Sequence, residues 1–114
     1  MLTAYGSSTT GLQLALLATP DGFEIASVLN RGKLQGSRIA AMASSMMAMA
    51  SAVGREIQST ECRRLTFEAD ANSVVLHSVA GKPPCILCVV VNKDALLGQV
   101  FWSIGEIVRE MESD

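Results

Sequence analysis

Sixteen consecutive residues in the first half of the chain, Ile39–Gly54, carry no charged side chain. Ser37 is a suitable N-cap, and the apolar spacing predicts a helix from about Arg38 to Gln58. Its apolar stripe comprises Ile39, Ala43, Met46, Ala50, Val53 and Ile57. The opposite side carries mainly Ala and Ser, where a solvated helix would carry Lys and Glu. We therefore expect this helix to be covered on both sides, one of them by a partner.

The composition limits both the architecture and the classes of function. A chain of 114 residues has room for one domain, which we place at residues 12–112 behind a flexible tail, 1–11. The formal charge of −2, without any basic block, argues against binding to nucleic acid or to a membrane. No Lys or Arg precedes Arg31 to form a signal peptide, and no apolar run reaches the roughly 20 residues of a membrane span. We expect a cytoplasmic protein.

Alternating apolar residues predict strands on both sides of the helix. Leu12, Leu14 and Leu16 begin a hairpin that turns at Thr19–Gly22 and returns to Leu29. Three further strands are predicted at 62–68, 73–79 and 85–91, and the last is continuously apolar, as in strands buried on both faces. Asn92 is a possible cap for a final helix, whose apolar stripe comprises Leu97, Val100, Phe101, Ile104, Val108 and Met111. The predicted fold is α+β with the order β-β-α-β-β-β-α.

The three cysteines, Cys62, Cys85 and Cys88, are the first candidates for chemistry. An odd number excludes a closed set of disulfides. Cys85 and Cys88 have the spacing of a redox or zinc motif, but residues three apart in a strand point to opposite faces. The sequence has neither a second such pair nor a histidine at zinc spacing. We predict structural cysteines, no bound metal and no cofactor.

The other candidates for catalysis or ligand binding are isolated. His77 is the only histidine, and the adjacent Ser78 would point to the other face of its strand. Gly81-Lys82 lacks the upstream Gly and the following Ser or Thr of a phosphate-binding loop. A group of methionines fits core or dimer packing, or alternatively an adaptable ligand groove: Met42, Met46, Met47 and Met49. The residues indicate no catalytic site and no enzyme.

Four stretches of the sequence together carry a resemblance to a known family. They are the hairpin Leu14–Ser27, the small-residue helix Arg38–Glu56, the strand pair Leu65–Val79 and the strand-to-helix run Cys85–Gly98. The step Asp21–Ser27 (DGFEIAS) is the most specific part. In this order the stretches resemble the Roadblock/dynein light chain domain, of the bacterial type associated with Ras-like GTPases. The resemblance implies an antiparallel five-stranded sheet with the long helix on one face and terminal helices on the other.

The resemblance also implies a function. In this family two subunits join through the third strand and pair their long helices antiparallel, and bacterial members bind and regulate small Ras-like GTPases. We therefore expect a non-enzymatic homodimeric adaptor that binds a small Ras-like GTPase and modulates its nucleotide cycle. The alternatives are a small-ligand sensor domain and a purely structural assembly subunit of a larger complex.

Two overlapping sets of residues are predicted to form the contacts. The homodimer interface is predicted to include Ala41, Ser44, Ser45, Ala48, Ala52, Arg64 and Thr66. The surface for the GTPase is predicted to include Arg38, Ala41, Ser44, Ala48, Arg55 and Glu56. The second set has a neutral centre between charged ends, so we expect charge at the rim to tune association and bulk at the centre to block it.

Overall fold

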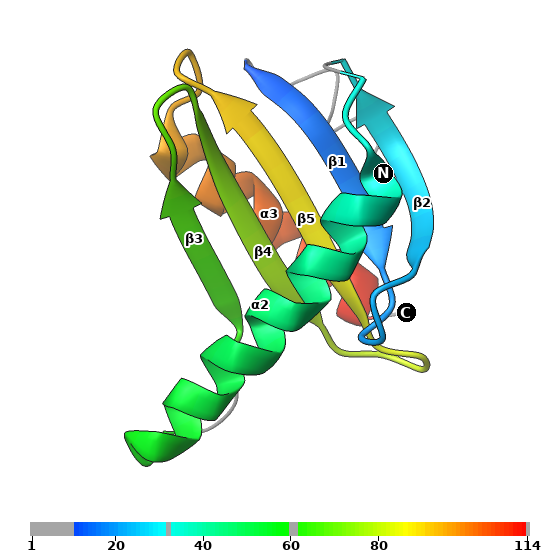
Figure 1. Cartoon of the computed structure of the whole chain (residues 1–114), viewed down its shortest axis with the longest axis vertical. Helices are drawn as coiled ribbons and strands as arrows, with labels where there is room; N and C mark the ends of the chain where they lie inside the picture. Colours follow the sequence, from blue (N-terminus) through cyan, green and yellow to red (C-terminus); the bar gives the residue numbers. More distant parts are fainter. Residues whose placement is uncertain (1–10, 32, 60–61, 114) are drawn as a thin grey trace.

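The chain forms a five-stranded antiparallel sheet with one helix on each face (Figure 1). This computed structural model describes residues 11–31, 33–59 and 62–113, so the predicted tail lies outside the described residues except for Gly11. The elements are β1 (Leu12–Ala18), β2 (Glu24–Asn30), α2 (Gly36–Glu56), β3 (Arg64–Glu68), β4 (Asn72–Val79), β5 (Cys85–Asn92) and α3 (Leu97–Glu112). The sheet order is β2-β1-β5-β4-β3. The predicted α+β class, element order and placement of the two helices are confirmed.

Strand β5 occupies the middle of the sheet and is buried on both faces. It pairs with β1 on one side and β4 on the other, and six consecutive residues, 86–91, are buried. Leu87, Val89 and Val91 pack in the layer under α3, whereas Ile86, Cys88 and Val90 pack in the layer under α2. The continuous apolar sequence of β5 is therefore explained by two covered faces, as predicted.

The two helices contribute very different side chains to these layers. From α3 the buried residues are Val100, Ile104, Ile107 and Val108, and the predicted apolar stripe of this helix is confirmed. From α2 the buried residues are only Ala40, Ala43 and Met47. Because alanines are short, the backbone of α2 lies close to the sheet. The buried side chains of α2 consequently fill less volume in their layer than the buried side chains of α3 fill in theirs.

The turn between β1 and β2 is fixed by its own hydrogen bonds and by α2. The Gly22 N–H donates to the Thr19 carbonyl at 3.0 Å, and the Phe23 N–H donates to Thr19 Oγ1 at 3.0 Å. Gly22 has φ +99°, a conformation that residues with a side chain rarely adopt. The Ser44 hydroxyl donates to the Pro20 carbonyl, which attaches the turn to α2. The predicted turn at Thr19–Gly22 is confirmed.

One strand pattern was predicted wrongly. Leu12 packs in the α3 layer and Leu14 in the α2 layer, although alternation places both on the same face. The pairing of β1 with β5 shifts register between these two residues, as at a β-bulge. Because a bulge inserts one extra residue into a strand, the side chains that precede it point to the opposite faces of the sheet from those that strict alternation predicts.

Both predicted helix caps are also wrong. The N-cap of α2 is Gln35, so Ser37 lies inside the first turn. The N-cap of α3 is Leu96, and neither cap residue makes a side-chain hydrogen bond. Asn92 instead ends β5, where its Oδ1 accepts a hydrogen bond of 2.9 Å from the Asp94 N–H. Asn side chains bond nearby backbone groups in turns as readily as at helix starts, so the sequence signal was ambiguous.

The α2 layer can be tested with a matched pair of leucines. Leu76 is fully buried in this layer, and Leu76→Ala should lower the free energy of unfolding by about 2–5 kcal/mol through lost burial and a residual cavity. Leu96 is 65% exposed, and Leu96→Ala should change it by less than about 0.5 kcal/mol. Urea denaturation measures both values. Equal losses at the two positions would contradict the described packing.

Candidate protein-interaction surface

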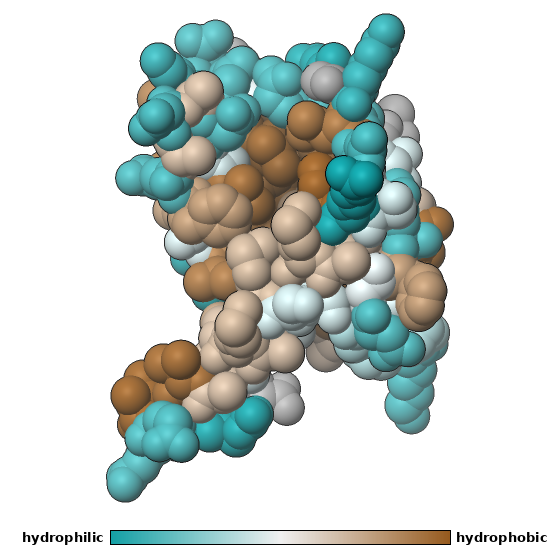
Figure 2. Space-filling model, viewed as in Figure 1, coloured by the Kyte–Doolittle hydropathy of each residue, from teal (hydrophilic) through white to brown (hydrophobic). Residues whose placement is uncertain are grey.

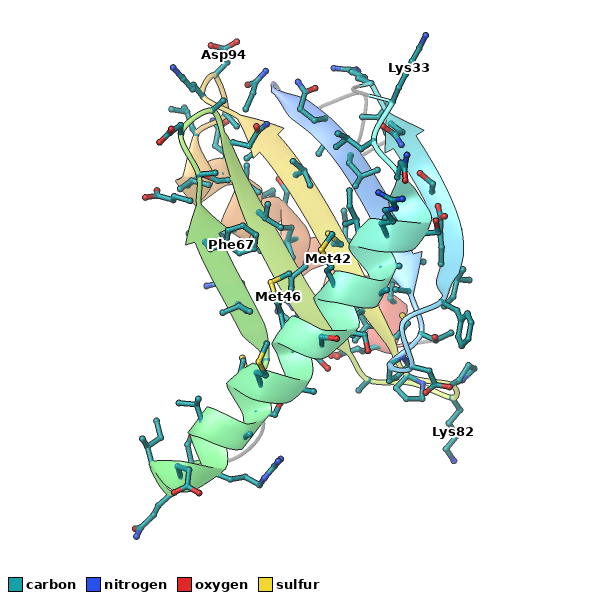
Figure 3. The ribbon with its side chains drawn as sticks, in the orientation of Figure 1. Lys33, Met42, Met46, Phe67, Lys82 and Asp94 are labelled. Carbon is teal, nitrogen blue, oxygen red and sulfur yellow. The ribbon has the colours of Figure 1, made fainter. Side chains whose placement is uncertain are left out.

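An apolar groove of about 830 Å³ runs between α2 and the neighbouring strands. Its lining comes from Leu34 before α2, from α2 itself (Ile39, Ala41, Met42, Ala43, Ser45, Met46, Met49) and from the sheet (Gln13, Phe67, Asn72, Val74, Leu76, Cys88, Val90). Figure 2 shows apolar side chains gathered in this hollow beside the helix. In Figure 3, Met42 and Met46 project from α2 on the side that faces β3, where Phe67 lies. The groove thus presents thioether and aromatic groups to solvent.

The C-terminal half of α2 continues beyond the edge of the sheet (Figure 1). Ile39 and Met46 of the predicted stripe pack on the sheet, but Val53 is 60% exposed and Ile57 is 71% exposed. Met49, next to them on the groove side, is 61% exposed. The predicted stripe is therefore covered by the chain itself only along its first half. Exposed apolar patches of this kind mark sites of interaction.

Strand β3 borders the groove and forms one edge of the sheet. It pairs only with β4, so one side of its backbone has no strand partner among the described residues. An uncovered edge strand is a ready template for pairing with another chain. Leu65 and Phe67 face the α2 side of the sheet. We use "the α2–β3 surface" for the edge of β3 together with Met42, Met49, Val53, Ile57 and Phe67.

The residues predicted for the dimer interface are distributed around α2 and along β3. Ala41 and Ser45 line the groove, and Ala48 and Ala52 are exposed. Ser44 is half-buried, and its hydroxyl points to the β1–β2 turn. On β3, Thr66 is half-buried and Arg64 places its guanidinium 4.4 Å from the ring centre of Phe101 in α3. The structure therefore places Ser44 outside the α2–β3 surface, and with it the side chains of Arg64 and Thr66, which alternate with Leu65 and Phe67 along β3.

The residues predicted for the GTPase surface lie along the length of α2. Arg38 is in its first turn, Arg55 and Glu56 are in its last, and all three are exposed. Ala41 and Ala48 are exposed between them. The neutral centre and charged ends that the sequence suggested are thus present on one helix.

Sequence reasoning missed the large apolar members of the α2–β3 surface. The apolar stripe predicted from the sequence included Val53 and Ile57, and Phe67 was placed only within a predicted strand at 62–68. The methionines were the available signal, because Met is used in adaptable binding surfaces as well as in cores. Their helical spacing could not tell the two uses apart.

The cysteines have no common site. Cys85 packs against the α3 layer, and Cys88 is fully buried in the α2 layer, so their thiols lie on opposite faces of β5 as predicted. Burial raises the pKa of the Cys88 thiol from its ordinary value of 9.0 to about 12, and burial also raises the pKa of Cys85. Both thiols are therefore protonated at neutral pH. A protonated, buried thiol is neither a nucleophile nor a metal ligand.

His77 and the acidic side chains were the other candidates for a reactive or metal-binding group. His77 Nδ1 lies 2.8 Å from the Ser78 carbonyl oxygen, to which a protonated Nδ1 donates. Within residues 11–31, 33–59 and 62–113, no three His, Cys, Asp or Glu side chains come together as metal ligands would. Neither α2 nor α3, the helices of the described residues, combines the length and apolarity needed to cross a bilayer.

A small antiparallel sheet with a helix on each face is the class of fold that these residues form, and the α2–β3 surface is its candidate interaction surface. The family model for the Roadblock/LC7 domain matches residues 3–90, and the chain belongs to this family. No curated protein sequence matches the chain.

Solved structures share the fold at low sequence identity. The gliding protein MglB from Thermus thermophilus superposes with a TM-score of 0.85 at 15% identity, over 98% of this chain and 84% of that one. An MglB with tetrameric arrangement gives 0.85 at 16% identity, over 98% and 83%. A Roadblock/LC7 domain from Streptomyces avermitilis gives 0.77 at 18% identity, over 91% and 85%. The chain therefore spans most of the length of each neighbour.

Because the Cys88 thiol is buried, we predict that the stability of the wild type relative to Cys88→Ala depends on pH. Below pH 9, Cys88→Ala should be less stable than the wild type by about 1–2 kcal/mol, because the variant loses buried volume. Between pH 9 and about 12 the unfolded chain releases the thiol proton while the folded chain retains it. In this range the free energy of unfolding of the wild type should fall, relative to that of the variant, by up to about 1.4 kcal/mol per pH unit.

Urea unfolding of both proteins at a series of alkaline pH values measures this difference directly. Groups that titrate in both proteins, such as lysines, cancel in the comparison. A difference that stays constant from pH 8 to pH 11 would contradict the burial of an ionisable thiol at this position.

Proposed function

We propose that the protein is a non-enzymatic adaptor that forms a homodimer through the α2–β3 surface and binds a small Ras-like GTPase. The observation that carries the proposal is the exposed apolar surface beside an edge strand. Membership of the Roadblock/LC7 family supports the same class of function. The self-association of an MglB with tetrameric arrangement, a protein of the same fold, also favours assembly of this chain.

A two-fold axis beside β3 accounts for each part of the α2–β3 surface. Two β3 edges would pair antiparallel and complete each other's backbone hydrogen bonds. The half of α2 that extends beyond the sheet would then lie over the partner subunit, where Val53 and Ile57 lose their exposure to water. Burying a side chain of this size is worth about 1.5–3 kcal/mol. Four such side chains, counted in both subunits, would contribute favourably to association and offset part of the entropy that is lost on association.

Paired α2 helices would also present their outward sides as one shared surface. Ala41 and Ala48 would form its neutral centre, with Arg38 and Glu56 toward the ends. A single GTPase lying across the two-fold would contact the two subunits differently, so we expect one GTPase per dimer. The adaptor would supply no catalytic group and would act by shifting the conformational population of the GTPase.

The groove itself favours a second candidate function, a small-ligand sensor. Its volume of about 830 Å³ lies within the usual range of ligand pockets, about 300–1,000 Å³. The lining is mostly apolar, and Gln13, Ser45 and Asn72 are the polar side chains on it. An apolar ligand in the groove would compete with the dimer contact for Met42 and Met49. The sensor and the homodimer are thus separable by experiment.

The homodimer is tested by introducing charge into the α2–β3 surface. Met49→Arg should weaken assembly by about 3 kcal/mol or more, because the new charge would be buried without a partner. Static light scattering should show the molecular mass halved at tens of micromolar. Phe23→Arg is the matched control, since Phe23 is equally apolar and exposed but lies beside β2, at the opposite edge of the sheet.

Two further substitutions test which side of α2 contacts the partner subunit in the dimer. Ser45 lines the groove, whereas Ala48 is exposed outside it. If the groove side forms the contact, Ser45→Arg should disrupt the dimer more strongly than Ala48→Arg. An unchanged mass for Met49→Arg and for Ser45→Arg would refute a dimer built on this surface.

The GTPase partner is tested by calorimetry against each Ras-like GTPase of the same genome, in both nucleotide states. We expect one of them to bind with one GTPase per two adaptor chains. Ala48→Gln should reduce affinity at least tenfold, about 1.4 kcal/mol, by adding bulk at the centre of the shared surface. Phe23→Arg should leave binding unchanged. Absence of binding in either nucleotide state would favour the assembly-subunit alternative.

A further inference from the structure

Trp102, the only tryptophan of the chain, is 70% exposed on α3. The buried residues of this helix, Val100, Ile104, Ile107 and Val108, lie on its other side. With 3.6 residues per turn, Trp102 is close to the centre of the side turned away from the sheet. Its neighbours one turn away on that side are Gly98 and Gly105. An exposed indole with a glycine on each side is not required by the fold described above.

No contact among the residues that the structure describes requires glycine at position 98 or at position 105. A Cβ atom built at Gly98 or at Gly105 would meet nothing within 4 Å. At Gly22, by contrast, a Cβ would lie 3.2 Å from the Ala41 backbone, and φ is positive. Glycine is the least favourable helix residue after proline, so Gly105, in the interior of α3, calls for a packing or functional reason, whereas Gly98 lies in the first turn. Here the open space beside each glycine points to a contact with a second molecule.

The spacing of the side chains on this surface is that of a helix–helix seam. Gly98, Trp102, Gly105 and Arg109 follow one another at intervals of four, three and four residues, the heptad spacing of paired helices. Arg109 is exposed and forms an ion pair of 2.8 Å with Glu106. The seam thus alternates a residue without a side chain and a residue with a large one. We call these four residues the α3 seam.

This alternation makes the α3 seam complementary to itself. If two copies cross antiparallel about the midpoint of residues 103 and 104, Trp102 faces Gly105 of the partner subunit and Arg109 faces Gly98 of the partner subunit. Every large side chain then meets a glycine, and the two helices overlap over residues 97–110. The two-fold relation also repeats each contact, as isologous interfaces require. We propose that α3 pairs antiparallel with α3 of a second copy of this chain through the α3 seam.

Charge supports the antiparallel arrangement. Glu106 of one copy would lie beside Gln99 of the other, whose amide can donate a hydrogen bond to the carboxylate. In a parallel pair the seam residues would meet their own copies, which brings Trp102 to Trp102 and Arg109 to Arg109. The same argument favours a second copy over an unrelated protein, because the chain itself supplies both halves of the fit. With two indoles as the main buried groups, the contact is of the small, reversible class.

The α3 seam is independent of the α2–β3 surface. The two helices lie on opposite faces of the sheet (Figure 1), so both contacts can form at once. A chain that uses both would build assemblies larger than a dimer. The inference therefore goes beyond the proposed function, and either could hold without the other.

The single tryptophan allows a direct test by fluorescence. We expect the emission maximum of the wild type to move to shorter wavelength as the protein is concentrated, because the indole leaves water. Gly105→Gln and Trp102→Ala should each raise the dissociation constant of this contact at least tenfold, and Gly105→Gln should abolish the emission shift. Glu110→Gln places the same side chain on α3 outside the seam and should behave like the wild type. Circular dichroism should show Gly105→Gln folded, since Gln favours a helix more than Gly.

Light scattering in the Met49→Arg background separates this inference from the proposed dimer. If both contacts are real, Met49→Arg still associates through the α3 seam, and Met49→Arg combined with Gly105→Gln is monomeric. If only the α3 seam is real, Met49→Arg matches the wild type in mass while Gly105→Gln alone is monomeric. An emission maximum independent of concentration, or a Gly105→Gln variant that assembles like the wild type, would overturn the inference.

Discussion

The burial of β5 on both faces is the constraint on which the rest of the structure depends. Its side chains alternate between two apolar layers, so a helix is needed on each face of the sheet. Those two helices, α2 and α3, are the ones that the described residues provide. Once both faces are covered in this way, the edges β2 and β3 remain the places where the sheet can still gain contacts.

The two layers divide stability and interaction between the helices. The α3 layer receives four branched or bulky side chains from its helix and anchors β3 through the contact of Arg64 with Phe101. The α2 layer receives two alanines and one methionine. Most of the large apolar side chains of α2 are therefore left facing the groove or the space beyond the sheet. Of the two helices, α2 is therefore the one that leaves exposed apolar surface for contact with another protein, as the proposed adaptor requires.

Much of the fold could be predicted from alternation alone, because each strand has a fixed period of two. The continuous apolar run of β5 and the stripe of α3 identified the two layers correctly. The facing of Leu12 could not be predicted, since a bulge leaves no mark in the sequence. Helical periodicity likewise showed which side of α2 is apolar, but not how far the sheet extends beneath it. Val53 and Ile57 were misassigned for that reason.

The candidate surfaces needed the structure even more than the fold did. Small residues on α2 suggested close approach of another helix, but the large residues beside them define the exposed surface. Gly98 and Gly105 were visible in the sequence, yet only coordinates show that no atom occupies the space beside them. Sequence reasoning thus singled out α2 as the candidate helix and missed the large side chains that the structure leaves exposed on it.

Hydrogen exchange at β3 tests the central claim most directly, because the claim concerns backbone groups at the edge of the sheet. In a homodimer joined through β3, the amides that point away from β4 become hydrogen-bonded to the partner strand. They should exchange slowly in concentrated wild-type protein and rapidly on dilution or in Met49→Arg, while the amides of β5 stay protected throughout. Rapid exchange of the outward β3 amides in concentrated wild-type protein, where light scattering shows an assembly, would contradict the account.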